Sequence, residues 1–208
     1  MPRKASQEAE QAGGQGAGIT QESGIRGKLS AFSGLVMLPH TVFALPFALA
    51  AVVLASHESR ITIPVLVLIV IAFTSARSAA MAFNRLVDQR LDRENPRTAG
   101  RHLPSGRLGR PVVWLFVIIA VAVFEVSAWV LGPLCFALSP VAVAVVFLYS
   151  YTKYFTSASH LVLGLALSIA PVGAYIAVTG RVSAGILLLA LAVAFWVAGF
   201  DIIYSLQD

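Results

Sequence analysis

Three oxygen-bearing side chains spaced four residues apart are the part of this sequence best suited to chemistry. Asn84, Asp88 and Asp92 follow directly after a long apolar run. If the helix of that run continues through them, the spacing of four places their side chains along one helical face. Carboxylate and amide oxygens are ligands for hard divalent cations. The spacing therefore predicts a cation site at the mouth of a hydrophobic segment.

The same stretch is rich in arginine, a residue suited to phosphate. Five guanidinium groups lie within it or just after it: Arg85, Arg90, Arg93, Arg97 and Arg101. Because arginine can bind phosphate through paired hydrogen bonds, acids and arginines together predict a metal-held diphosphate. The alternative is a solvated basic loop, since Lys and Arg gather on the cytoplasmic side of membrane proteins. That alternative explains the arginines better than it explains the spacing of the acids.

The elements that carry these residues are expected to be membrane helices. The chain has 208 residues, of which 58% are hydrophobic and 12% charged, and its mean hydropathy is +0.81. Soluble domains carry about 25% charged residues. The composition therefore predicts an all-α, polytopic transmembrane helix bundle. The net charge of +5 reflects membrane topology and does not imply nucleic acid, and the single Cys135 excludes an internal disulfide.

Hydropathy predicts six membrane spans after a disordered amino-terminal tail at residues 1–28. The tail is rich in Gly, Gln, Ala, Ser and Glu and has no apolar periodicity. Each span has enough apolar residues to cross a bilayer, which takes about 20. The predicted spans lie at about 29–56, 61–83, 111–131, 134–152, 161–178 and 182–204.

A second acidic group lies at the end of the sixth span. Asp201, Tyr204 and Asp208 are spaced by three and four residues, which again places them on one helical face. The basic loop after the second span should be cytoplasmic. Because the chain crosses the membrane an even number of times between the two acidic groups, both groups emerge on the same side. They can therefore share one ligand.

Four other polar residues lie in or beside the predicted spans. Arg77 is two helical turns before the first acidic group, and a charge at that depth favours a polar cavity over lipid. Tyr149 and Lys153 are four apart, so a phenol and an ammonium can hold phosphate together; an aromatic belt with a snorkelled lysine is the alternative. Glu125 is expected to be protonated or hydrogen-bonded to another helix.

Carboxylates from two helices repel one another unless cations lie between them. Mg²⁺ commonly binds one or two carboxylates plus substrate phosphates, which suits a diphosphate bridged by metal. Metal-assisted departure of diphosphate from an allylic lipid leaves a carbocation, and a water-free cavity protects that cation from hydrolysis. The lipid tail can reach such a cavity from the bilayer.

Both acidic stretches resemble motifs of the UbiA superfamily of intramembrane prenyltransferases. NRLVDQRLDRENPRTAGRHLPSG resembles the first aspartate-rich motif and its following loop, and DIIYSLQD resembles the start of the second. The similarity extends from about Lys28 to the carboxyl end. HTVFALPFALA and NPRTAGRHLPSG resemble the branch of 4-hydroxybenzoate polyprenyltransferases and their menaquinone-pathway relatives.

The resemblance implies nine transmembrane helices around a central cavity and Mg²⁺-dependent transfer of a polyprenyl group. The donor would be a polyprenyl diphosphate, and the acceptor an aromatic acid such as 4-hydroxybenzoate in quinone biosynthesis. A dihydroxynaphthoate of menaquinone biosynthesis remains an alternative acceptor. The active site would lie on the cytoplasmic side of the cell membrane, in contact with membrane lipid and without any role for nucleic acid.

Matched position by position, the resemblance also implies roles for individual residues. The implied metal ligands are Asn84, Asp88, Asp92, Asp201 and Asp208. The implied residues near the diphosphate are Tyr149 and Lys153, with Arg97 and Arg101 in the loop that closes over the phosphates and Tyr204 within the second motif. Asp88, Asp92, Asp201 and Lys153 would be catalytic. Arg77 is a candidate for the carboxylate of the acceptor.

The sequence departs from the family pattern after Asp208. The family's second motif continues to a further acid and is followed by three more helices, so six spans of nine are expected here. The domain at 29–208 is therefore expected to be truncated at its carboxyl end and to have little activity alone. Two other classes stay open: a transporter component whose acids bind a translocated cation, and a non-catalytic membrane remnant. Clustering of the charges at one face disfavours the transporter.

Overall fold

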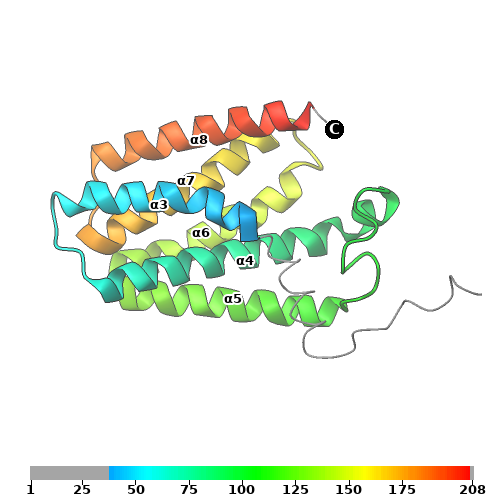
Figure 1. Cartoon of the computed structure of the whole chain (residues 1–208), viewed down its shortest axis with the longest axis horizontal. Helices are drawn as coiled ribbons and strands as arrows, with labels where there is room; N and C mark the ends of the chain where they lie inside the picture. The colour runs from blue at the N-terminus through cyan, green and yellow to red at the C-terminus, as the bar shows by residue number, and fades with distance from the viewer. Residues whose placement is uncertain (1–37, 207–208) are drawn as a thin grey trace, which may run out of the picture.

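The computed structural model describes residues 38–206, and the side chains of residues 45–206. The predicted tail at 1–28 and the metal-ligand candidate Asp208 lie outside this part. Six helices run up and down along one common axis (Figure 1). They are α3 (Leu38–Ser56), α4 (Ile63–Glu94), α5 (Arg110–Leu131), α6 (Pro133–Thr152), α7 (Ser159–Thr179) and α8 (Ala184–Ser205).

The helices confirm the prediction of an all-α transmembrane bundle. Five of them, α4 to α8, are long and apolar enough to cross a membrane. The apolar part of α3 whose side chains are described, Leu45–Ser56, is shorter. No strand occurs between residues 38 and 206.

Proline and glycine set the ends of several helices. The first turns of α4, α5 and α6 each contain a proline, which costs no helical hydrogen bond there because the first backbone N–H groups have no intrahelical partner. Gly132, between α5 and α6, has φ 142°, and Gly180, after α7, has φ 70°. Both values lie in the region that favours glycine, so these two residues permit the tight turns.

Helix α4 is longer than the membrane is thick. Its 32 residues span about 48 Å, whereas the hydrocarbon core of a bilayer is about 30 Å. The second predicted span ends near Phe83, but the helix continues without a break to Glu94. Asn84, Asp88 and Asp92 lie in this last part of the helix, which leads into the loop at 95–109 (Figure 1).

Two clusters of buried apolar side chains hold the bundle together. One joins the second half of α4 to α5 and to Leu103 and Leu108 of the following loop, which fixes that loop against the helices. The other joins α3, the start of α4, α7 and α8 around the fully buried Tyr175. Glu125 of α5 accepts a hydrogen bond of 2.5 Å from Ser139 of α6, which confirms the expected interhelical bond.

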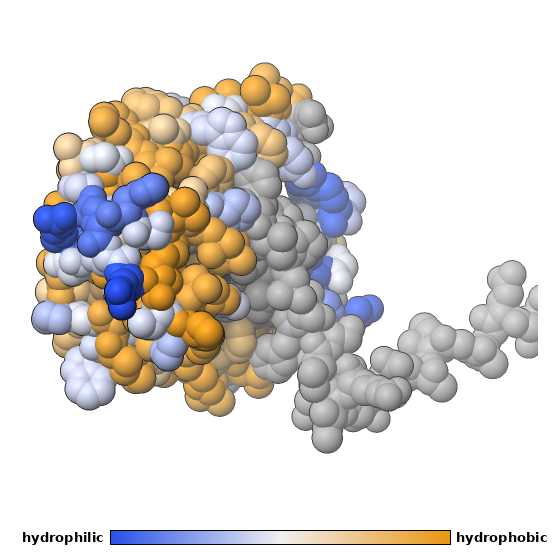
Figure 2. All heavy atoms as spheres, turned by 60° about the vertical axis from the view of Figure 1, so that its left-hand side comes forward, coloured by the Kyte–Doolittle hydropathy of each residue, from blue (hydrophilic) through white to orange (hydrophobic). Residues whose placement is uncertain are grey.

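At the end of the bundle away from the acidic motifs, Glu58 in the loop after α3 contacts Tyr175 of α7 and Arg181 in the loop after α7. The Tyr175 hydroxyl donates to Glu58 Oε1 at 2.6 Å, and Arg181 forms an ion pair with the same carboxylate. Figure 2 shows the molecule with this end brought forward, where small hydrophilic patches lie among a mostly hydrophobic surface. The Tyr175 hydrogen bond and the Arg181 charge lower the pKa of Glu58 from its usual 4.5.

The lowered pKa of Glu58 predicts a pH-dependent contribution to stability. A carboxyl whose pKa is depressed on folding stabilises the fold above its unfolded pKa of 4.5, and loses this effect as pH falls through the folded value. Glu58→Gln should lower the Tm at pH 7, and the difference from wild type should shrink as pH falls below 4.5. Glu94→Gln is the control, because its pair with Arg90 is exposed and should contribute little at any pH. A constant Glu58→Gln difference down to pH 3 would contradict this prediction.

Helices α7 and α8 come into very close contact at Gly164. A Cβ added at this glycine would lie 2.1 Å from the backbone carbonyl oxygen of Ala194. Backbone atoms cannot rotate away as a flexible side chain can. Only glycine at position 164 therefore allows the two helices to pack at this distance.

Gly164→Ala should separate α7 from α8 and destabilise the fold by about 1–3 kcal/mol, the usual cost of overpacking. Gly173→Ala is the matched control, because a Cβ at Gly173 in the same helix meets nothing within 4 Å. Thermal unfolding of both variants in detergent measures the difference. Equal Tm values for the two variants would show that the close approach does not matter.

Candidate active site

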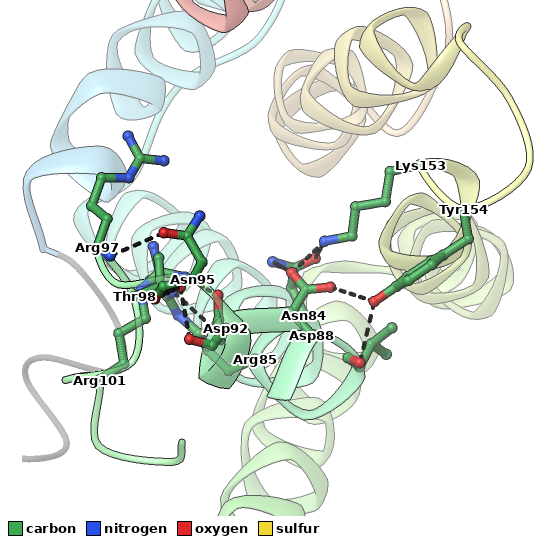
Figure 3. A network of polar contacts seen from close by, with 11 residues as sticks. Asn84, Arg85, Asp88, Asp92, Asn95, Arg97, Thr98, Arg101, Lys153 and Tyr154 are labelled. Atoms are coloured by element: carbon green, nitrogen blue, oxygen red, sulfur yellow. Dashed lines mark hydrogen bonds and ion pairs between the residues drawn. The ribbon is translucent and has the colours of Figure 1, made fainter. Parts of the chain in front are cut away.

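Two buried carboxylates lie one turn apart on α4, close to its carboxyl-terminal end (Figure 3). Asp88 and Asp92 keep only 7% and 6% of their surface exposed. Asn84, on the same face one turn earlier, donates from Nδ2 to Asp88 Oδ2 at 3.1 Å. Because a buried carboxylate is costly unless it is paired, each acid needs partners from other segments.

The partners of Asp88 follow the end of α6. Lys153 forms an ion pair with Asp88 Oδ2, and its Nζ also lies 3.3 Å from Asn84 Oδ1. The Tyr154 hydroxyl donates to Asp88 Oδ1 at 3.0 Å. Both partners lie at least 65 residues further along the chain than Asp88. Packing of α6 against α4 therefore brings an ammonium, a phenol, an amide and a carboxylate to one point.

Burial, and then the hydrogen bond to Asp88, raise the pKa of the Tyr154 phenol to about 12. The phenol therefore keeps its proton at neutral pH and acts as a donor. A donor at one oxygen of Asp88 and a cation at the other fix the orientation of this side chain.

The partners of Asp92 come from its own helix and from the loop that follows. Arg101 Nη1 lies 2.6 Å from Asp92 Oδ1, and Arg85 Nη1 lies 3.7 Å from Oδ2. The Oδ2 atom is buried and accepts no hydrogen bond from the described residues. Oδ2 of Asp92 can therefore accept a hydrogen bond or bind a cation that the described residues do not supply.

The loop after α4 is shaped by side chains that bond to the backbone. Thr98 is buried, and its hydroxyl donates to the carbonyl oxygen of Asp92 at 2.9 Å. Asn95 Oδ1 accepts from the backbone N–H of Arg97 at 2.9 Å. These bonds fold the loop back so that Arg101 reaches Asp92, whereas the guanidinium of Arg97 points away from Asp92 (Figure 3).

The second acidic motif has its own partner. His160 Nδ1, at the start of α7, lies 2.7 Å from Asp201 Oδ2 of α8. Tyr204 is 55% exposed and stacks on Phe200 with ring centroids 6.5 Å apart.

Tyr149 of α6 lies near both acidic motifs. Its phenol is within the electrostatic reach of Asp201, Asp88 and Arg77. The Nε of Arg77 is buried and has no hydrogen-bond partner in the described part of the chain. The ends of α4, α6 and α8 also lie at the same end of the bundle (Figure 1). The first motif, the second motif and Arg77 therefore all act electrostatically on one phenol.

The residues on α4 fit a hard cation that binds together with a phosphate. Asn84, Asp88 and Asp92 offer only oxygen donors from one helical face, and Asp92 Oδ2 has unused acceptor capacity. Among residues 45–206, no three His, Cys, Asp or Glu side chains lie close enough together to hold a metal ion by themselves. Mg²⁺ commonly completes its shell with phosphate oxygens and water, so two carboxylates are sufficient.

The structure separates the arginines of the first motif and adds two residues that the sequence pattern did not single out. Arg85 and Arg101 lie at Asp92, whereas Arg90 and Arg93 line a groove elsewhere on α4. Two partners of the acids, Tyr154 and His160, were missed. Each lies on the same side of the membrane as the acids, and that position is the only signal the sequence offers for them.

The fold and this site define a polytopic membrane protein with paired acidic and basic groups gathered at one end of a helical bundle. The chain belongs to the UbiA prenyltransferase family, whose sequence pattern matches residues 44–208.

Relatives of known sequence are similar over the same region. A 4-hydroxybenzoate octaprenyltransferase from Tolumonas auensis is 35% identical over 132 residues, which cover 64% of this chain and 46% of that protein. The protein of the same name from Legionella pneumophila is 30% identical over 149 residues, covering 71% of this chain and 52% of that protein. The chain thus spans about half the length of these relatives.

Solved structures share the fold. A UbiA homologue from Aeropyrum pernix, in its apo form, is 35% identical with a TM-score of 0.74, covering 82% of this chain and 64% of that one. A UbiA homologue from Archaeoglobus fulgidus bound to DMAPP and Mg²⁺ is 20% identical with a TM-score of 0.71, covering 85% of this chain and 63% of that one.

Proposed function

We propose that this chain forms the diphosphate-binding part of a site that transfers a polyprenyl group to an aromatic acid. The donor is a polyprenyl diphosphate and the acceptor is 4-hydroxybenzoate. The observation that carries the proposal is the convergence of Lys153 and Arg101 on the buried acids Asp88 and Asp92. Anions, cations and one unsatisfied carboxylate oxygen at one point suit a ligand that arrives with both metal and phosphate.

The metal proposed for this site is Mg²⁺. Asn84, Asp88 and Asp92 would hold it from α4, and Asp201 and Asp208 from the second motif. When bound, Mg²⁺ supplies positive charge that stabilises the departing diphosphate. The Archaeoglobus homologue with DMAPP and Mg²⁺ supports this choice at the level of the fold.

The chain's own residues bind and orient the donor. Lys153 and Arg101 carry N–H donors that can turn from the carboxylates to phosphate oxygens, which are also anionic. Arg97, in the same loop, is proposed to close over the phosphates, and Tyr204 to border the second motif. Tyr154 and Asn84 hold Asp88 in one orientation while the cations engage the ligand.

The acceptor is proposed to bind deeper in the bundle, at Arg77. This guanidinium lies about three turns before Asp88 on α4, and its Nε has no hydrogen-bond partner among the described side chains. A planar guanidinium matches a carboxylate, and a buried one without an anionic partner favours an anionic ligand. Tyr149 is within electrostatic range of both Arg77 and Asp88, which supports a position of the acceptor ring near the donor.

We place the site on the cytoplasmic side of the inner membrane. The basic loop at 95–109 lies at this end of the bundle, and basic residues favour the cytoplasm. The named relatives are bacterial, which supports the inner membrane as location.

Asp88→Asn should weaken Mg²⁺-dependent binding of geranyl diphosphate to the purified chain by at least about 10-fold to 100-fold, the range seen when groups that support a metal site are removed. The same variant should lower any transfer of the prenyl group to 4-hydroxybenzoate. Glu94→Gln is the control, because Glu94 is an exposed acid on the same helix, outside the site. Unchanged diphosphate affinity in Asp88→Asn would overturn the proposed metal site.

Arg77→Met should weaken binding of 4-hydroxybenzoate by about 10-fold or more, because a charged hydrogen bond contributes about 1.5–3 kcal/mol. Binding of 4-methylphenol, which lacks the carboxylate, should change little. Equilibrium binding of both phenols to wild type and variant separates loss of a carboxylate contact from general damage to the pocket. Equal losses for the two ligands would contradict the role given to Arg77.

A further inference from the structure

A groove lies on the face of α4 turned away from the acids. It has a volume of about 790 Å³, within the range of small-molecule sites. Residues of α4 and α5 and one residue of α6 line it: Phe83, Leu86, Val87, Gln89, Arg90, Arg93, Glu94, Arg110, Trp114 and Tyr151. None of the metal or substrate candidates named above is among them.

Helical geometry explains why the groove and the acids do not overlap. Successive residues of an α-helix are rotated by about 100°, so Phe83, Arg90 and Arg93 fall on the side of α4 opposite Asn84 and Asp88. One helix therefore presents Asn84 and Asp88 on one side and Arg90 and Arg93 on the other.

The polar part of the groove is basic. Three arginines and one glutamate give it a net charge of +2. Arg110 Nη1 donates to Gln89 Oε1 at 3.0 Å, and Arg90 forms an exposed pair with Glu94 at 3.4 Å. Arg93 is exposed beside them.

The apolar part of the groove is aromatic and lies toward the membrane. Phe83 stacks on Phe147 at a centroid distance of 4.1 Å and meets Trp114 and Tyr151 edge to face at 5.7 and 5.9 Å. Trp114 and Tyr151 are 41% and 47% exposed. Arg90 and Arg93 are two to three turns nearer the end of α4 than Phe83, so the charged part lies at the level of lipid headgroups.

We propose that this groove binds an anionic phospholipid of the surrounding bilayer. Its phosphate lies among Arg90, Arg93 and Arg110, and an acyl chain lies along Trp114 and Tyr151. Basic groups at the headgroup level above an aromatic wall match both parts of such a lipid. A soluble anion would engage the arginines but leave the aromatic wall uncovered. A bilayer lipid reaches both parts because the groove opens on the outside of the bundle.

General attraction of basic loops to anionic membranes predicts no preference for these particular arginines. The chain offers a comparison within the same end of the bundle, because Arg107 is exposed and does not line the groove. A site requires Arg93 and Arg110 more than Arg107, whereas a diffuse surface potential treats the three alike.

Trp114 allows a direct test, because it is one of only three tryptophans in the chain. Trp129→Phe/Trp196→Phe leaves it as the sole tryptophan of the full chain, which is then placed in phosphatidylcholine vesicles and excited selectively. Brominated phosphatidylglycerol should quench the fluorescence of Trp114. Half-maximal quenching should occur at a lower mole fraction of this lipid than of brominated phosphatidylcholine. Adding Arg93→Gln/Arg110→Gln should weaken this preference about 5-fold per arginine, whereas Arg107→Gln should leave it unchanged.

A second tryptophan on the same helix tests whether phosphatidylglycerol is preferred near any exposed tryptophan, and not only at the groove. Trp114→Phe/Trp196→Phe keeps Trp129, which is 67% exposed near the other end of α5 and should show no preference for phosphatidylglycerol. Arg93→Gln alone replaces the double substitution if that protein does not fold. Equal quenching of Trp114 by the two lipids would overturn the proposal. A preference lost equally in Arg107→Gln and in the groove variants would overturn it too.

Discussion

Charges at the edge of a membrane must be paired, and this requirement shapes the end of the bundle where the acidic motifs lie. Asp88 and Asp92 are buried on a helix that has just left the hydrocarbon, so each would be costly without a cation or donor. Asp88 obtains its partners from the end of α6, and Asp92 obtains Arg101 from the loop after α4. The positions of α6 and of the loop are therefore tied to the two carboxylates.

In the proposed function, the same pairing would prepare the site for its ligand. A lysine and an arginine held against carboxylates are already positioned where an anionic ligand would meet a metal, so little side-chain order must be gained on binding. Among the described residues three buried side-chain polar atoms have no hydrogen-bond partner: Asp92 Oδ2, Arg77 Nε and Ser150 Oγ, of which the first two belong to charged groups. One suits a cation and the other an anion.

Much of this arrangement could be predicted from the sequence because it depends on local periodicity. The spacing of Asn84, Asp88 and Asp92 follows the helix that carries them, and hydropathy alone located the helices to within a few residues at most ends. Counting the crossings was enough to place Lys153 on the side of the acids. The interhelical bond of Glu125 followed from the cost of an isolated carboxylate in lipid.

What could not be predicted depends on contacts between distant segments. Tyr154 and His160 have no spacing that marks them, and only the packing of α6 on α4 and of α7 on α8 reveals their partners. The arginines of the first motif form one cluster in the sequence, yet the turn of α4 divides them between the site and a groove. Tyr204 is spaced for the second motif, but in the structure it stacks on Phe200.

The account depends on the two acidic motifs binding one metal–diphosphate ligand together. The most direct test is a double-mutant cycle in which Mn²⁺ binding, with geranyl diphosphate present, is measured by electron paramagnetic resonance. The proteins are wild type, Asp88→Asn, Asp201→Asn and the double variant. A shared site predicts that the losses of the two single variants are not additive, with a coupling of about 0.5–3 kcal/mol. Strictly additive losses, or an Asp201→Asn protein that binds Mn²⁺ as wild type does, would contradict the account.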